Sequence, residues 1–396
     1  MDERDLCGDF AHLNIDKFSG RQTGMTGGKL EKIFGAPQRY IQGVGAMGGL
    51  GDCLGYLGNR FFIFGDEIVL SLVRAKIASG LILRQKDPVF ESFNGESSKR
   101  EINRLSERCK ILACDVVVGV GGGKAADTAK AIGFSLRIPI VVLPTIASTD
   151  APTSRLIAIY SEEHNLVEVL RMDKNPDAVV VDTEIIAQAP SRFLVSGMGD
   201  ALSTKFEAEM CALTQAKNFF NGQSTQGALL LARSCYDIIR QYGLEAKRSV
   251  EDKRVTEALE RVVEANIFMS GIGFESGGLA AAHAIHAGFT LIPEMKNSFH
   301  GEKVAFGLLV QFVMEKRSKP FIEDMIDFYH SLGLPSTLEE LGLQEITSEK
   351  LKRIAQRACM PNTYMFNMAM PVDEEMVIKA IVEADALSHS YAKRHP

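Results

Sequence analysis

Residues 114–134, CDVVVGVGGGKAADTAKAIGF, indicate the fold more clearly than any other stretch of the chain. The run 115–120 is short and rich in valine, which is typical of a strand buried on both faces of a parallel sheet. A Gly-Gly-Gly-Lys turn over 121–124 follows at once, and helical spacing continues over 124–136. The stretch therefore predicts a buried strand that passes through a tight turn into a helix.

The same alternation of strands and helices extends outward from this stretch. Further strand patterns lie at 60–67, 139–145 and 177–183, and further helical patterns lie at 67–79 and 99–113. This alternation predicts an α/β N-terminal domain of Rossmann-like type, in which helices cover both faces of a parallel sheet.

The pattern changes near Pro190. From residue 193 onward helical periodicity is almost continuous and no clear strand is present, as in the stretches 254–274, 301–318 and 373–395. A length of 396 residues fits two or three domains. We expect a poorly structured extension over 1–35, an α/β domain over 36–190 and an all-α domain over 191–396.

Composition and charge argue against several classes of protein. The chain has 46% hydrophobic and 24% charged residues, which is ordinary globular usage and not that of a disordered or fibrous protein. A net charge of −6 gives no electrostatic basis for binding nucleic acid or a membrane surface. No apolar run of about 18 residues could span a membrane, and the acidic N-terminus lacks the apolar core of a secretory signal. The seven cysteines are scattered without a C-x-x-C pair, which predicts reduced thiols and a cytoplasmic protein.

The glycine turn is a candidate nucleotide site. Glycines let the backbone approach a ligand closely, and the start of the next helix offers unpaired N–H groups and a partial positive charge to a pyrophosphate. Lys124 would add a full positive charge there. Asp66, which ends the strand pattern at 60–67, could bind the two hydroxyls of a nucleotide ribose or could cap the next helix. For the glycine stretch, the alternative is a tight turn without a ligand.

Histidines and carboxylates form a second candidate site. His283, His286 and His300 fall within eighteen residues, in a region of small residues that would let bulky groups approach. A catalytic zinc ion takes about three protein ligands and keeps one position open. Two histidines leave one ligand to be found, and spacing does not choose between Asp200, Glu207 and Glu209. The residues predict a mononuclear site of histidine and carboxylate, with ordinary core packing of the histidines as the alternative.

Four motifs carry a resemblance to a known family. They are VGVGGGKAADTAKA (118–131), LPTIASTDAPTS (143–154), GFESGGLAAAHAIH (273–286) and HGEKVAFG (300–307). In order and spacing they resemble the metal-dependent ("iron-containing") alcohol dehydrogenase family, and among its members those that oxidise glycerol. The resemblance covers about residues 38–396. It implies the dehydroquinate synthase-like architecture, reversible NAD-dependent oxidation of glycerol to dihydroxyacetone, and a homo-oligomer, with octamers common in the family.

The resemblance also implies roles for individual residues. The family's metal ligands fall on Asp200, His283 and His300, and Thr204 stands where iron-using relatives have a further histidine, which favours one Zn²⁺ per subunit. His286 would lie near the metal and orient a ligand or contact substrate. Asp150 would contact the polyol, and Asp150 or water is the candidate for proton relay. The implied cofactor contacts are Asp66, Gly121, Gly122, Gly123, Lys124, Asp127, Thr145, Ser148, Ser154, Leu156 and Tyr160.

Three alternatives stay open on the sequence. Spacing does not distinguish glycerol from a related diol or polyol. A dehydroquinate-synthase-like lyase would need several Lys or Arg side chains near the metal, but 196–209 holds only Lys205 and 277–289 holds none. The third alternative is a nucleotide-binding protein that catalyses no reaction and in which the histidines only pack.

Overall fold

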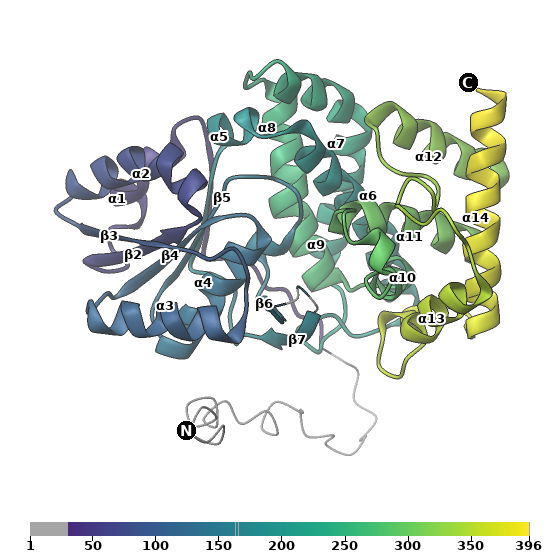
Figure 1. Ribbon diagram of the computed structural model, residues 1–396, viewed down its shortest axis with the longest axis horizontal. Helices are drawn as coiled ribbons and strands as arrows, with labels where there is room; N and C mark the ends of the chain where they lie inside the picture. The colour runs from purple at the N-terminus through teal and green to yellow at the C-terminus, as the bar shows by residue number, and fades with distance from the viewer. Residues whose placement is uncertain (1–30, 163, 165, 396) are drawn as a thin grey trace. The chain divides into compact units, whose positions relative to one another are not determined.

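A six-stranded parallel sheet forms the N-terminal part of the protein (Figure 1). The structure is a computed structural model that describes residues 31–162, 164 and 166–395. The strands are β1 (Arg39–Gly43), β2 (Arg60–Gly65), β3 (Asp87–Ser92), β4 (Val116–Gly121), β5 (Ile140–Pro144) and β8 (Ala178–Asp182). They lie in the order β1-β8-β5-β4-β2-β3, and every neighbouring pair is parallel. The four predicted strands are confirmed as β2, β4, β5 and β8.

The sheet is buried on both faces. In β2, Phe61 and Ile63 pack into one hydrophobic cluster, which includes Leu70 and Val73, while the alternate residues Phe62 and Phe64 belong to a second cluster. Because successive side chains of a strand point to opposite faces, a strand covered on both sides needs a continuous apolar run. That requirement explains why the central strands could be recognised from the sequence.

The helices between the strands are α1 (Leu50–Leu54), α2 (Glu67–Ile82), α3 (Lys99–Ile111) and α4 (Gly123–Leu136), and α5 (Thr183–Gln188) follows the last strand, β8. Between β5 and β8 the chain also forms an antiparallel hairpin of β6 (Leu156–Tyr160) and β7 (Leu166–Arg171), which the sequence reading did not predict.

The strand order reverses direction between β2 and β4. From β2 the chain runs outward through α2 to the edge strand β3, and it then returns through α3 to β4 on the other side of β2. In open α/β sheets, ligands bind outside the carboxyl ends of the strands at such a switch point. Asp66 follows β2 and Gly122 follows β4, so both residues lie at this place in the topology.

The C-terminal part is helical. Its α-helices are α6 (Ser191–Thr214), α7 (Gln226–Glu251), α8 (Glu257–Glu264), α9 (Ser270–Gly277), α10 (Ala281–Phe289), α11 (His300–Met314), α12 (Lys319–Leu332), α13 (Ser348–Ala358) and α14 (Glu374–Arg394). Within the described residues 191–395 no strand is present. One π-helical turn, η5 (Ala265–Met269), joins α8 to α9.

The predicted domain division stays a prediction. The described residues from 32 onward pack as one compact unit, and the chain enters α6 directly after Pro190. Most of the predicted extension over 1–35 lies outside the described residues. At its end, the Ile33 N–H donates to the Gln223 carbonyl at 3.2 Å and the Gly35 N–H donates to Ser276 Oγ at 3.1 Å.

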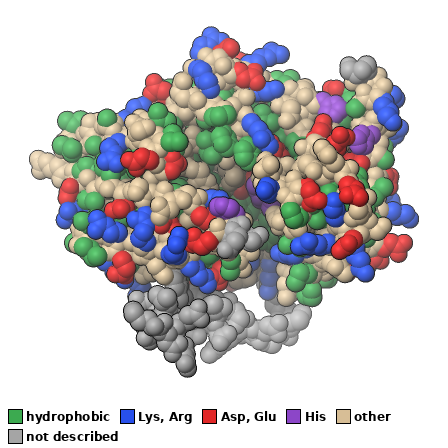
Figure 2. All heavy atoms as spheres, in the orientation of Figure 1, with side chains coloured by type: hydrophobic (Ala, Val, Ile, Leu, Met, Phe, Trp, Pro, Cys, Tyr) green, Lys and Arg blue, Asp and Glu red, His purple; other side chains and the backbone are tan. Residues whose placement is uncertain are grey.

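Three features of the described part of the chain concern its helices, its surface charge and its cysteines. No helix among the described residues is long and apolar enough to cross a membrane. On the face shown in Figure 2, basic and acidic side chains are interspersed, and histidine side chains appear both near the centre of that face and toward its upper right. The six cysteines that the structure describes are free.

Candidate active site

Three helices bring Asp200, His283 and His300 together. Asp200 lies on α6, His283 on α10 and His300 at the first position of α11. One ligand atom from each residue lies within 4.8 Å of the others. Asp200 Oδ1 is 3.0 Å from Nε2 of His300 and 3.4 Å from Nε2 of His283. Two imidazole nitrogens and one carboxylate oxygen form a donor set suited to a divalent transition metal.

The second nitrogen of each imidazole is held by a further residue. Nδ1 of His283 is 2.6 Å from Glu207 Oε2, and the Glu207 carboxylate also accepts from the N–H groups of Ala280 and His283. An ionised carboxylate only accepts, so Nδ1 of His283 carries a proton, and Nε2 is the nitrogen that would bind a metal. Nδ1 of His300 is 3.0 Å from Nε2 of His286. Both Nε2 atoms therefore face Asp200 in the orientation that metal binding requires.

Asp200 has one oxygen without a hydrogen-bond partner. The side chain is fully buried, and Oδ2 accepts from the Asp150 N–H at 3.3 Å, but no donor reaches Oδ1 with hydrogen-bond geometry. Burial alone would raise the pKa of Asp200, but the neighbouring His300 and His283 hold it below its ordinary value. A buried, ionised oxygen without a donor is costly unless a cation is bound there. The residues present thus fit a metal ion.

The structure shows which of the three carboxylates considered from the sequence could be the third metal ligand. Glu207 is fully buried and orients His283, whereas Glu209 pairs with Arg233 at 2.6 Å. Of the three, only Asp200 belongs to the group that could bind a metal. Thr204, one turn after Asp200, lies 2.8 Å from the Ser270 hydroxyl.

Asp150 lies beside this group, at the carboxyl end of β5. Its side chain is buried and makes no cap for the short helix η4 (Ala151–Thr153). Instead Oδ2 accepts from Ser270 Oγ at 2.7 Å. Burial and, after it, the charge of Asp200 raise the pKa of Asp150 well above its ordinary value. The sequence-predicted substrate contact is thus next to the candidate metal ligands.

The glycine turn leaves the start of α4 open. Gly121 has φ +148°, a conformation that favours glycine, and Gly122 occupies the N-cap position without a side-chain cap. Across the switch point, Asp66 caps α2, where its Oδ1 accepts from the Val69 N–H at 3.0 Å. The capping alternative for Asp66 is therefore observed, and a carboxylate has acceptor sites left for a further partner.

Two lysines fix the surroundings of the turn. Lys124 donates to the buried Glu96 at 2.7 Å and lies 5.7 Å from the centre of the Tyr160 ring. Lys130 is fully buried and donates to Asp127 at 3.0 Å and to the carbonyls of Ala151 and Leu156. Lys130 thereby ties α4 to the segment that carries the other predicted cofactor contacts.

The remaining predicted contacts lie on that segment. The Thr145 N–H donates to the Gly121 carbonyl at 3.1 Å, and the Ser148 carbonyl accepts from Ser196 Oγ at 3.2 Å. Ser154 Oγ donates to the Ala151 carbonyl at 3.2 Å. Gly123 begins α4, Leu156 begins β6 and Tyr160 ends it.

Sequence reasoning missed several residues that shape the site. Glu207 lies two helical turns after Asp200 on the same face, a spacing that fits an orienting residue as well as the alternative metal ligand considered from the sequence. Ser270 and Glu96 gave no signal, because their partners Asp150 and Lys124 lie far away in the chain. Lys130 pairs with Asp127 within the predicted helix, but its two carbonyl partners lie more than 20 residues away.

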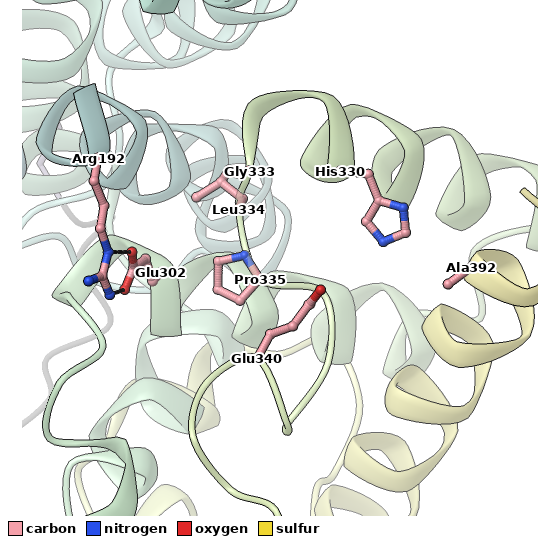
Figure 3. A pocket seen from close by; sticks show the side chains of 8 residues that line it. All are labelled: Arg192, Glu302, His330, Gly333, Leu334, Pro335, Glu340 and Ala392. Atoms are coloured by element: carbon pink, nitrogen blue, oxygen red, sulfur yellow. Dashed lines mark hydrogen bonds and ion pairs between the residues drawn. The ribbon is translucent and has the colours of Figure 1, made fainter. Parts of the chain in front are cut away.

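A cavity of about 420 Å³ lies elsewhere in the helical part (Figure 3). Its lining residues are Arg192, Glu302, His330, Gly333, Leu334, Pro335, Glu340 and Ala392. Arg192 and Glu302 face each other there as a two-bond ion pair, at 2.6 and 2.9 Å. None of the three candidate metal ligands lines this cavity, so it is distinct from the site above.

Comparison with known proteins places the chain in one family. Residues 37–183 match the family model described as iron-containing alcohol dehydrogenase. The chain is 47% identical over 363 residues to a glycerol dehydrogenase of Citrobacter freundii, across 92% of this chain and 100% of that protein. The chain belongs to the iron-containing alcohol dehydrogenase family and is an oxidoreductase that acts on a CH–OH group.

Within that family, solved structures point to the same group of enzymes. The crystal structure of a glycerol dehydrogenase from Schizosaccharomyces pombe has a TM-score of 0.89 and 36% identity, covering 93% of this chain and 94% of that one. A probable glycerol dehydrogenase from Sinorhizobium meliloti has a TM-score of 0.86 and 41% identity, covering 91% of this chain and 99% of that one. The sequence-level resemblance to glycerol-oxidising members of the family is confirmed.

Proposed function

We propose that the protein catalyses the reversible, NAD-dependent oxidation of glycerol to dihydroxyacetone at a zinc ion held by Asp200, His283 and His300. The observation that carries this proposal is the buried Asp200 Oδ1, which lacks a donor and faces two imidazole Nε2 atoms. The similarity to glycerol dehydrogenases supports the choice of substrate.

Zinc is proposed because of the ligand number. Three protein ligands of type N, N and O with one position open are typical of catalytic zinc. Thr204 occupies the place one turn after Asp200, and its hydroxyl is bound to Ser270 rather than directed at the ligand group as an imidazole would be. The chain offers no fourth protein ligand there among the described residues.

NAD is proposed to lie at the switch point between β2 and β4. The uncapped start of α4, after Gly121 and Gly122, would hold the pyrophosphate, with Lys124 beside it. Asp66 would accept from the ribose hydroxyls while it still caps α2. Asp127, Thr145, Ser148, Ser154, Leu156 and Tyr160 are the further proposed contacts.

The chain's own residues would bind and orient the substrate. Asp150 would accept hydrogen bonds from hydroxyl groups of glycerol that do not react, because a carboxylate has several acceptor positions. Glu207 and His286 would hold the two imidazoles in place. When bound, the cation supplies polarisation of the reacting C–O bond and NAD supplies the hydride acceptor.

The proposal is tested by incubating the purified protein with glycerol, NAD and Zn²⁺. The expected products are NADH and dihydroxyacetone in equal amounts, identified by absorbance and chromatography. Absence of both, with a different diol oxidised instead, would assign the chain to another substrate of the same class. Assembly into a homo-oligomer and a cytoplasmic location stay predictions from the sequence.

A further inference from the structure

The loop that carries Asp150 is fastened onto one segment of the helical part. From the π-helical turn η5, the Asn266 side chain donates to the Ala147 carbonyl at 3.1 Å, and the Ile267 carbonyl accepts from Thr153 Oγ1 at 3.0 Å. A Cβ atom on Gly271 would lie 1.9 Å from Thr153 Oγ1, so the two segments of the chain touch closely here. The position of the loop is thus set by the segment 266–271, and π-helical turns often occur at functional sites.

Ser270 is the residue of this segment that reaches the Asp150 side chain. It is fully buried, and its Oγ donates to Asp150 Oδ2 at 2.7 Å. Ser270 Oγ also lies 2.8 Å from Thr204 Oγ1, a contact in which either hydroxyl can donate.

The result is a chain of two hydrogen bonds that joins Thr204, Ser270 and Asp150. Its first member stands one turn after Asp200 on α6. The positions of the Asp150 carboxylate and of the candidate metal ligand Asp200 are therefore both fixed by helix α6. The backbone N–H of Asp150, which donates to Asp200 Oδ2, adds a second link between them.

We propose that Ser270, backed by Thr204, is a specificity-determining positioning residue that makes the site selective for polyhydroxy alcohols over alcohols with one hydroxyl. This inference rests on the proposed function, because it takes Asp150 as the group that contacts the polyol. Ser270 holds Oδ2, so the carboxylate keeps one rotamer and presents its remaining acceptor positions to the hydroxyls that do not react. An alcohol with one hydroxyl makes no use of those positions and gains nothing from Ser270.

The test compares glycerol with propan-2-ol in the zinc-loaded full chain and in the variants Ser270→Ala, Thr204→Val and Thr204→Ser. We expect Ser270→Ala to raise the KM for glycerol about tenfold, as the loss of one buried hydrogen bond implies. Thr204→Val should raise it about threefold, and Thr204→Ser, which keeps the hydroxyl, should leave it near wild type. The kcat/KM for propan-2-ol should change less than twofold in each variant. If propan-2-ol is turned over too slowly to measure, its KI as an inhibitor of glycerol oxidation should change less than twofold.

Three further readouts separate positioning from a structural role. The KM for NAD and the bound zinc should be unchanged in each variant, and Ser270→Ala should cause little extra loss in an Asp150→Asn background. An equal loss on both alcohols, or a fall in bound zinc, would overturn the inference while the wild-type oxidation of glycerol still stood. If Ser270→Ala fails to fold, the pair Thr204→Val and Thr204→Ser decides the question. A wild-type protein that does not oxidise glycerol would overturn the proposed function itself and this inference with it.

Discussion

The backbone N–H of Asp150 donates to the carboxylate Oδ2 of Asp200 at 3.3 Å. Asp150 follows the sheet strand β5, and Asp200 lies within the first helix of the helical part. This bond joins the two parts of the chain at the candidate active site. It also leaves Asp200 Oδ1 free to face the two imidazoles, so the geometry of the proposed metal site depends on the end of the sheet.

His283 is expected to be essential for metal binding. His283→Ala removes one of three ligands, so bound zinc measured by elemental analysis should fall at least tenfold and glycerol oxidation should be lost. His389→Ala is the matched control, because His389 lies beside Asp385 on α14 and does not belong to the candidate metal group. Full zinc content together with full activity in His283→Ala would remove His283 from the site.

Glu207 is expected to tune the metal site without binding the metal. Glu207→Gln removes the charged acceptor that holds Nδ1 of His283, and such changes typically weaken metal binding 10- to 100-fold. Competition with a chelator of known affinity measures the effect. Glu209→Gln, on the same helix, should bind zinc like the wild type. Equal affinities for Glu207→Gln and wild type would contradict the orienting role.

Asp66 is expected to serve both as a helix cap and as a cofactor contact, and one pair of variants separates the two. Asparagine caps a helix about as well as aspartate, so Asp66→Asn should leave the unfolding midpoint unchanged but raise the KM for NAD about tenfold. Asp66→Ala should in addition lose about 1 kcal/mol of unfolding free energy. If Asp66→Asn binds NAD as tightly as wild type, Asp66 is a cap and nothing more.

Glu275 is expected to make stability depend on pH. Burial raises its pKa to about 7, from an ordinary 4.5, although it accepts from the Arg155 N–H at 2.9 Å and from Asn175. Between pH 4.5 and 7 the folded chain therefore binds more protons than the unfolded chain, and its unfolding free energy falls as pH rises, by roughly 3 kcal/mol from this group.

Denaturant titrations at pH 5 and pH 8 measure this dependence. Glu275→Gln cannot ionise, so the wild-type protein should lose roughly 3 kcal/mol more stability than the variant between the two values. Equal losses in both proteins would show that Glu275 does not titrate in this window.

The central strands and the glycine turn were predictable because burial on both faces leaves a continuous apolar run in the sequence. The edge strands were not, since β1 reads RYIQG and β3 reads DPVFES, with polar residues and a proline that fit the partly exposed edge of a sheet. The hairpin of β6 and β7 was missed for a similar reason, because β7 is half exposed.

The candidate site was predictable in its residue types but not in its geometry. The cluster of His283, His286 and His300 suggested a metal, yet spacing alone could not separate Asp200 from Glu207, since both lie on the same face of α6. Their different roles follow from where α10 and α11 approach that helix. The part played by Ser270 depends on packing between segments 120 residues apart, for which the sequence holds no local signal.

Removal and return of the metal tests the central claim most directly. The purified protein is dialysed against a chelator, assayed with glycerol and NAD, and then titrated with Zn²⁺ while bound metal and activity are followed together. The account predicts that activity disappears with the metal and returns in proportion to zinc, reaching its maximum at about one ion per chain. A metal-free protein that oxidises glycerol at the full rate would contradict it.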